Sequence, residues 1–271
     1  MKAAAFEYAR AWDAADAVRL LQEAGPDAKL IAGGQSLGPM LNLRVARPAR
    51  LIDVRRCPDL AGSSEDGDAI VLGAGLTHAA IEDGRADDPT PGWLAPIARG
   101  IAYRAVRNRG TVGGSLAHAD PAADWPSAFL ALGAAVRVHG PEGARDVQME
   151  DFVQAPFTVA LGPAEILTGV RLPKRGAAAK WGYWKFCRKI GEFAKAIGCV
   201  LHDPDRGETR AVIGAAERPP ILIRDAAGLL DDPASADDIV GREAPDLAPA
   251  ARRLHAEALT RAARIANGSA A

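Results

Sequence analysis

The chain has 271 residues, of which 48% are hydrophobic and 25% are charged, a composition typical of a globular protein with one large or two smaller domains. Its 33 Lys and Arg residues almost balance its 34 Asp and Glu residues, so no overall positive field favours nucleic acid as a partner. Three scattered cysteines, Cys57, Cys187 and Cys199, exclude a zinc knuckle or a four-thiolate iron–sulfur cluster built by this chain alone.

The same features bear on where the chain resides. Few cysteines fit a reducing compartment, and Glu7 interrupts the N-terminal segment before the apolar region of a signal peptide could form. The longest apolar stretch, near 129–138, is too short to span a bilayer. We therefore expect a cytoplasmic protein without membrane insertion.

Helical and strand patterns alternate along the first two thirds of the chain. An amphipathic helix is predicted over 12–25, where small and apolar residues recur at helical spacing until Gly25-Pro26 ends the pattern. Apolar runs bounded by Gly, Pro or charged residues predict buried strands at 29–32, 51–54, 69–72, 134–138 and 165–172. Further helices are predicted at 77–83, 94–102 and 124–132. Because no regular βαβ repeat emerges, the pattern favours an α+β fold over a doubly wound sheet.

Pro173-Lys174-Arg175-Gly176 is the best candidate for a domain boundary, since Pro and Gly flank two charges just after a predicted strand. Beyond it, a strand apolar on both faces is predicted at 181–186, with a short partner strand at 210–214. A helix is predicted at 246–266, followed by a frayed tail at 268–271. Its expected buried stripe is Leu247, Ala251, Leu254, Ala258 and Ile265.

Two glycine loops carry the strongest binding motifs. Ala32-Gly33-Gly34-Gln35-Ser36-Leu37 follows a predicted strand, and Thr111-Val112-Gly113-Gly114-Ser115-Leu116 lies much further along the chain. Paired glycines can take positive φ and turn consecutive N–H groups toward one concavity that binds phosphate, and nearby Ser and Thr hydroxyls add donors. Two such loops suit a diphosphate held from both sides, which indicates a dinucleotide.

These segments also allow other interpretations. Either loop alone could be an ordinary tight turn, and neither continues as a Walker A loop, which disfavours an ATP or GTP hydrolase. The segment 71–78 imitates a nicotinamide-dinucleotide fingerprint, but His78 stands where a small residue should pack. His118, Asp120 and Asp124 could bind a metal, although no second histidine lies at helical spacing, so no metal site is expected. Asp124 could also serve as a helix N-cap.

Taken together, these segments resemble the FAD-binding medium subunits of the xanthine dehydrogenase and carbon monoxide dehydrogenase family, the molybdenum hydroxylases. The resemblance rests on 32–37, 107–124, 165–173 and 188–194, whose order and spacing cover nearly the whole chain. It implies an FAD-binding domain of the vanillyl-alcohol oxidase (PCMH) type at 1–173, with two α+β halves at about 1–56 and 57–173. A smaller α+β C-terminal flavoprotein domain would follow at 174–271.

The resemblance also implies residues that hold a noncovalent FAD, with no catalytic residue on this chain. The segments 30–37 and 111–115 would hold the diphosphate, Ile101 and Leu167 would line the adenine or ring pocket, and Asp124 would hydrogen-bond the sugar or ribityl region. Lys185, if not a snorkelling strand lysine, and Phe193, where some relatives have Tyr, would approach the isoalloxazine. The complete expected set is Leu30, Ile31, Ala32, Gly33, Gly34, Gln35, Ser36, Leu37, Ile101, Thr111, Val112, Gly113, Gly114, Ser115, His118, Asp120, Asp124, Leu167, Lys185 and Phe193.

In function, the resemblance implies the electron-transfer subunit of an oxidoreductase complex. In this family a large molybdopterin subunit hydroxylates the substrate, and two 2Fe-2S clusters on a small subunit deliver electrons to FAD, which passes them to an external acceptor. We therefore expect a heterotrimer or a dimer of heterotrimers. The alternatives are a free-standing FAD-dependent reductase or oxidase and a scaffold protein that keeps the fold without cofactor.

Overall fold

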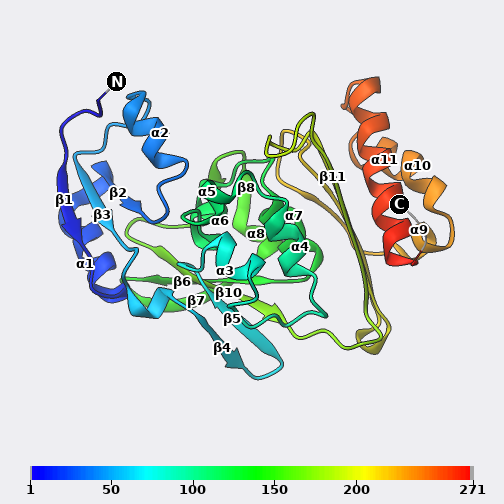
Figure 1. Ribbon diagram of the computed structural model, residues 1–271, viewed down its shortest axis with the longest axis horizontal. Coiled ribbons are helices and arrows are strands. Elements are labelled where there is room, and N and C mark those ends of the chain that lie inside the picture. Colours follow the sequence, from blue (N-terminus) through cyan, green and yellow to red (C-terminus); the bar gives the residue numbers. More distant parts are fainter. Residues whose placement is uncertain (1, 269–271) are drawn as a thin grey trace.

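The computed structural model describes residues 2–268, which form three larger β-sheets and a two-stranded ribbon, with helices packed on and between them (Figure 1). The strand orders are β1-β3-β2, β4-β5-β10-β6-β7 and β11-β12-β13-β14, and β8 pairs with β9. One parallel sheet, two antiparallel sheets and many interspersed helices confirm the expected α+β class. No helix within 2–268 combines the length and the apolar character needed to cross a membrane.

The first sheet is parallel and is coloured blue in Figure 1. Its elements are β1 (Glu7–Arg10), α1 (Ala14–Ala24), the 3-10 turn η1 (Gly25–Asp27), β2 (Ala28–Ile31), α2 (Leu37–Asn42) and β3 (Arg50–Asp53). The N-cap of α1 is Asp13, whose carboxylate accepts a hydrogen bond from Asp16 N at 2.7 Å. The first glycine loop leaves the sheet at the carboxyl end of β2 and leads into α2, so the parallel sheet presents this loop at one edge.

The second sheet is antiparallel and lies at the centre of the molecule in Figure 1, beside a group of short helices. Its strands are β4 (Ser63–Asp66), β5 (Ala69–Gly73), β6 (Ala135–Gly140), β7 (Gly143–Gln148) and β10 (Ile166–Pro173). The helices and the ribbon are η2 (Pro58–Leu60), α3 (His78–Glu82), α4 (Leu94–Arg99), α5 (Arg104–Arg107), α6 (Val112–His118), α7 (Asp124–Ala131), α8 (Met149–Phe152), β8 (Val153–Ala155) and β9 (Thr158–Val159). An isolated bridge joins Thr77 to Thr111, which brings the starts of α3 and α6 together.

The third sheet is an antiparallel meander followed by the C-terminal helices, which are orange and red in Figure 1. Its elements are β11 (Lys180–Phe186), β12 (Ala196–Asp203), η3 (Pro204–Arg206), β13 (Glu208–Gly214), β14 (Ile221–Ile223), α9 (Ala227–Asp231), η4 (Pro233–Ser235), α10 (Ala236–Glu243) and α11 (Pro249–Ala266). Helix α11 packs so closely on this sheet that a Cβ on Gly182 would lie 1.7 Å from Ala262 O, and one on Gly198 would lie 2.4 Å from Ala258 O.

Strand β12 separates two hydrophobic cores. Ile197, Cys199 and Leu201 belong to the larger core, which also holds residues from α1 and the second sheet, whereas Val200 faces the smaller core under the C-terminal helices. Helix α7 packs against β12 and β13 within the larger core. The proposed domain boundary at Pro173 falls between the second and third sheets, and the division into domains stays a prediction.

Three expectations about the C-terminal third are wrong. The strand predicted at 210–214 does not pair with β11, because β12 lies between them. Helix α11 begins at Pro249 rather than at 246, and 269–271 of the expected tail lie outside the described residues. Of the expected buried stripe, Ala258 is buried, but Leu247, Ala251, Leu254 and Ile265 are only partly buried. The buried face consists mainly of small residues, because larger ones would not fit over the glycines of β11 and β12: His255, Ala256, Ala258, Leu259, Ala262, Ala263 and Ala266.

Candidate functional site

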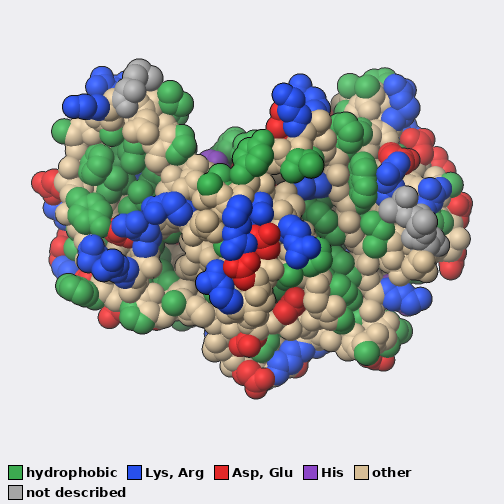
Figure 2. Space-filling model, viewed as in Figure 1, with side chains coloured by type: hydrophobic (Ala, Val, Ile, Leu, Met, Phe, Trp, Pro, Cys, Tyr) green, Lys and Arg blue, Asp and Glu red, His purple; other side chains and the backbone are tan. Residues whose placement is uncertain are grey.

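The two glycine loops lie against each other although they are far apart in the sequence. A Cβ on Gly33 would lie 2.1 Å from Arg109 O and 2.9 Å from Gly110 Cα, so the first loop directly contacts the backbone that leads into the second loop. Figure 2 shows a notch on the upper edge of the molecule, and Figure 1 places α2 on one side of this notch and α5 and α6 on the other. The fold therefore assembles both motifs at one place.

The first loop presents a row of unbonded backbone N–H groups. Gly34 has a φ of 71°, and Gly38 N donates to Gly34 O at 2.9 Å as α2 begins. Within the part of the chain that the structure describes, the N–H groups of 33–37 make no hydrogen bond. Consecutive free N–H groups ahead of a helix are the kind of nest that binds phosphate. These free N–H groups support phosphate binding by this loop, which stays a prediction.

The second loop does not form such a nest, and the expectation of one is wrong. The N–H groups of 112–115 already donate to Leu76 O, Ala74 O, Thr111 Oγ1 and Thr111 O, at 2.9–3.0 Å. Residues 112–115 belong to the first turn of α6, which Thr111 caps. This segment therefore offers a ligand the side of the helix start and the hydroxyl group of the partly exposed Ser115, not backbone donors, while Thr111 is buried and its hydroxyl oxygen accepts from Gly114 N.

Positive φ was also expected of the paired glycines, and only Gly34 has it. Gly33 and Gly113 are required for a different reason, which is close packing. A Cβ on Gly113 would lie 2.6 Å from the Cβ of Ala74, whereas one on Gly114 would meet only Thr111 Oγ1, at 2.9 Å. The need for glycine is therefore strict at Gly33 and Gly113 and weaker at Gly114.

The buried His78 packs against the backbone just before the second loop. His78 N donates to Gly110 O at 3.0 Å, and Trp125 Nε1 donates to His78 Nδ1 at 3.0 Å. Burial, assisted by the charge of Arg107, lowers the pKa of His78 from 6.5 to about 4. The imidazole is consequently neutral at physiological pH, with its proton on Nε2. A Cβ on Gly110 would lie 2.9 Å from this ring, which explains the glycine before Thr111.

The other expected ring-pocket residues lie in or beside the larger core. Ile101 is partly buried in a turn where Ala102 has a φ of 42°, and Arg107 NH1 donates to the carbonyls of Ile101 and Ala102 at 2.9 Å each. Leu167 is only 7% exposed, next to a register shift in β10. Ile101 thus keeps surface for a ligand, while Leu167 has little.

Asp124, Lys185 and Tyr183 form a hydrogen-bonded cluster between α7 and β11. Asp124 Oδ1 accepts from Tyr183 OH and from Lys185 Nζ, each at 2.6 Å, and Lys185 Nζ also donates to Gly100 O at 2.7 Å. The N-cap of α7 is Ala123, so the interpretation of Asp124 as a cap is wrong. The Lys185 side chain is only 13% exposed and its ammonium pairs with Asp124, so it does not snorkel to solvent.

Tyr183 is not part of any of the sequence motifs, yet it contacts an expected site residue directly. The available signal is the alternation along β11, which places Tyr183 and Lys185 on the same side of the strand. Burial, and then the negative charge of Asp124, raise the pKa of the Tyr183 phenol well above 10.0. Its hydroxyl therefore stays protonated and acts as a donor.

His118, Asp120 and Phe193 lie in local contacts of different kinds. The His118 ring packs against Phe157 in a tilted arrangement, with centroids 5.2 Å apart and an interplanar angle of 52°, and Asp120 Oδ1 accepts from Ala122 N at 2.9 Å. Phe193 is 65% exposed on the segment between β11 and β12. That segment approaches the turn after α4, since a Cβ on Gly191 would lie 2.7 Å from the ring of Tyr103.

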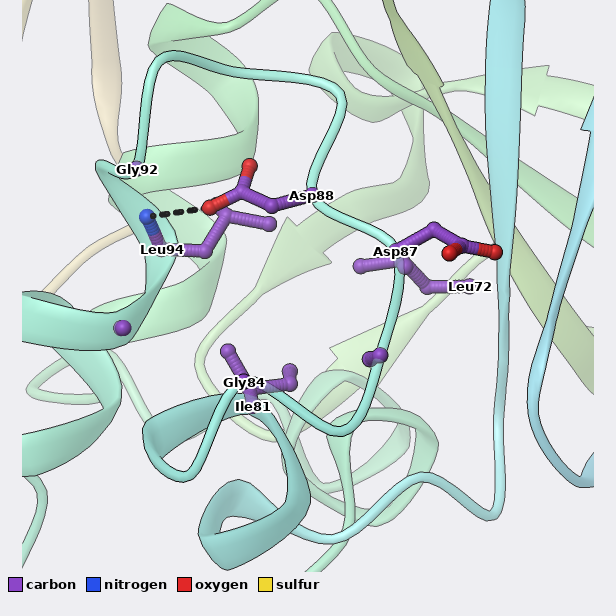
Figure 3. A pocket seen from close by; sticks show the side chains of 9 residues that line it. Leu72, Ile81, Gly84, Asp87, Asp88, Gly92 and Leu94 are labelled. Atoms are coloured by element: carbon purple, nitrogen blue, oxygen red, sulfur yellow. Dashed lines mark hydrogen bonds between the residues drawn. The ribbon is translucent and has the colours of Figure 1, made fainter.

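A separate small cavity lies near the start of α4 (Figure 3). Its volume is about 270 Å³, and its walls include Leu72, Ile81 and Leu94 but no residue of either glycine loop. Asp88 Oδ2 accepts from Leu94 N at 3.4 Å there, which is a structural contact. Because neither glycine loop lines it, this cavity is not the site that the motifs predict.

Comparison with known proteins decides the family. Residues 4–175 match the model of the FAD binding domain in molybdopterin dehydrogenase. The chain belongs to this family. The nicotine 6-hydroxylase medium subunit of Paenarthrobacter nicotinovorans is 38% identical over 80% of this chain and 76% of that protein. The carbon monoxide dehydrogenase medium chain of Afipia carboxidovorans is 40% identical over 72% of this chain and 68% of that protein.

Solved structures agree with the sequence matches. A carbon monoxide dehydrogenase from Hydrogenophaga pseudoflava, which lacks the Mo-pyranopterin moiety of its molybdenum cofactor, is 30% identical, with a TM-score of 0.89 over 100% of both chains. The chain is therefore an FAD-binding oxidoreductase subunit of the molybdenum hydroxylase family, and the resemblance seen in the sequence is confirmed. The alternative of a free-standing reductase or oxidase is not favoured.

The described residues fit FAD. The unbonded N–H groups of 33–37 suit the negative charge of a diphosphate, and the close contact of Gly33 with Arg109 leaves both loops facing one region. The cluster around Asp124 adds a partly buried carboxylate and ammonium that can bond to hydroxyl groups.

Proposed function

We propose that this subunit holds one noncovalent FAD with its diphosphate on the loop 33–37 and relays electrons from iron–sulfur clusters on a partner subunit to an external acceptor. The observation that supports this most is the row of free N–H groups at 33–37, pressed against the second loop in a chain of the FAD-binding family. The loop 111–115 would complete the diphosphate site with the hydroxyl group of Ser115 and a close-packed wall.

The remaining residues would position the rest of the cofactor. Ile101 would pack against a ring, Asp124 would accept a hydrogen bond from the sugar or ribityl region, and the exposed Phe193 would cover the isoalloxazine. The bound FAD would supply the one- and two-electron chemistry, while the protein supplies position and electrostatics. Lys185 would contribute less charge than a free lysine, because Asp124 pairs with its ammonium.

The names of the relatives and the arrangement of the cysteines in this chain both support partner subunits that carry the metal centres. The relatives are named as medium subunits or chains, and the Hydrogenophaga enzyme is named with a molybdenum cofactor. The three cysteines do not come together: among the described residues, no group of three or more His, Cys, Asp or Glu side chains could hold a metal ion. We therefore propose a large molybdopterin subunit and a small 2Fe-2S subunit as partners, in a heterotrimer or a dimer of heterotrimers.

The test uses the full chain expressed alone and titrated with FAD. We expect about one FAD per chain, released unchanged by acid, and no oxidation of a hydroxylase substrate. Flavin that remains with the acid-denatured chain would show a covalent link. A colourless chain that gains no flavin spectrum in excess FAD would contradict the proposal and favour the scaffold interpretation.

A further inference from the structure

The carboxylate of Asp124 is bonded unequally at its two oxygens. Oδ1 accepts both hydrogen bonds of the cluster, from Tyr183 OH and from Lys185 Nζ, each at 2.6 Å. Oδ2 accepts none from the residues that the structure describes, and it is not among the fully enclosed polar atoms without partners. One oxygen is therefore held by the protein, while the other is available to a group that reaches the site.

Lys185 has spare bonding capacity at the same place. Two of the three N–H groups of its ammonium are used, one by Asp124 Oδ1 and one by Gly100 O at 2.7 Å. A free acceptor on Asp124 and a remaining donor on Lys185 thus belong to two bonded side chains. A hydroxyl group, which donates one hydrogen bond and accepts others, matches this pair better than a carbonyl or an anion would.

We propose that Tyr183 is a positioning residue, which holds Asp124 so that Oδ2 accepts a hydrogen bond from a hydroxyl of the sugar-alcohol chain of FAD. The proposal rests on the proposed function and adds a residue and a contact to it. The phenol acts through Asp124 and does not itself need to touch the cofactor. Lys185 alone would leave the carboxylate free to rotate about one ion pair, whereas two donors from neighbouring positions of β11 fix its plane.

The direction of the Tyr183 hydrogen bond is set by the surroundings of the phenol. Its burial and the adjacent carboxylate oppose loss of its proton, so Tyr183 donates and Asp124 remains the acceptor. Among the residues that the structure describes, removing the hydroxyl would leave Lys185 as the only partner of Oδ1. The carboxylate could then turn and present either oxygen to Lys185, which would cost affinity for the ligand without removing any charge.

The test compares Tyr183→Phe with Tyr8→Phe in the full-length chain. Tyr8 is a matched control, since its hydroxyl donates to Asp53 Oδ2 at the same distance of 2.6 Å but in the N-terminal sheet. For each variant, the apoprotein is prepared, its Tm is measured, and the Kd for FAD is measured by quenching of flavin fluorescence. We expect Tyr183→Phe to raise the Kd about tenfold, as loss of one charge-assisted hydrogen bond does, with the Tm of the apoprotein close to that of Tyr8→Phe.

The possible outcomes separate a failure of the Tyr183 proposal from a failure of the proposed function. If wild-type apoprotein binds FAD and Tyr183→Phe binds it with the wild-type Kd, Tyr183 does not position Asp124, although the proposed function stands. If Tyr183→Phe lowers only the Tm of the apoprotein and leaves the Kd unchanged, its role is structural and the proposal is also wrong. If the wild-type chain itself fails to bind FAD, the proposed function fails. A raised Kd for Tyr183→Phe alone supports the positioning role.

Discussion

The contact between Gly33 and Arg109 leads to a sharp prediction about Gly33→Ala. The added Cβ would lie 2.1 Å from Arg109 O, whereas real Cβ contacts essentially never fall below 3.0 Å, so the two loops would have to separate by about 0.9 Å. Binding sites need their groups held within about 0.5 Å, and overpacking of this kind costs about 1–3 kcal/mol. We therefore expect the Kd for FAD to rise by about 5- to 150-fold.

The matched control is Gly38→Ala, five positions along in α2. A Cβ on Gly38 meets nothing within 4 Å, so alanine should fit and should stabilise the helix by about 0.5–1 kcal/mol. Both variants are checked for folding by circular dichroism and are then titrated with FAD. A folded Gly33→Ala variant with the wild-type Kd would refute the idea that contact between the loops shapes the diphosphate site.

Three further predictions follow from buried polar groups. Asp124→Ala should weaken FAD binding by about 1–3 kcal/mol in a fluorescence titration and lower the apoprotein Tm, because it leaves the buried Lys185 unpaired; an unchanged Kd would exclude a ligand contact. Arg175→Met should lower the free energy of unfolding in urea by about 3–5 kcal/mol, because Asp203 is 1% exposed and keeps only the distant Arg206, at 3.9 Å, within the described residues. Arg85→Met, in an exposed pair, should cost less than about 1 kcal/mol. The pKa of His78 falls from 6.5 to about 4 on folding, so the unfolded chain takes up a proton at this residue before the folded chain does. The fold therefore loses about 3 kcal/mol of stability as the pH falls from 6.5 toward 4. The Tm of His78→Gln should depend less on pH over this range than the Tm of the wild type, and equal slopes would contradict this.

Local sequence patterns predicted about half of the helices and strands in the first two thirds of the chain, and they missed β1, α2, β4, α5, α6, β7, α8, β8 and β9. Strong signals such as Gly25-Pro26 after α1, or the apolar run of β5, depend on neighbouring residues alone. The pairing of β11 with β12 and the alanine face of α11 depend on long-range packing, because glycines in the sheet let the helix approach closely. A search for large apolar stripes cannot reveal such an interface.

In the candidate site, too, local motifs indicated some features, whereas others depend on contacts between distant parts of the chain. The motif around Gly33 indicated a phosphate loop, and the structure gives this loop its free N–H groups. The motif around Gly113 looked equivalent, but its N–H groups are used by α6 and by Ala74, which no local pattern reveals. Tyr183 lies outside every motif, and its contact with Asp124 arises only when β11 packs beside α7.

Coexpression tests whether this chain functions as one subunit of a larger complex. The chain, coexpressed with the products of the neighbouring genes, is purified by size-exclusion chromatography, and the eluted complex is analysed for molybdenum, iron and flavin. We predict a heterotrimer or a dimer of heterotrimers that contains all three, while the chain expressed alone binds FAD and oxidises no hydroxylase substrate. A lone chain that oxidises an organic substrate with an artificial acceptor, without molybdenum or iron, would contradict this account.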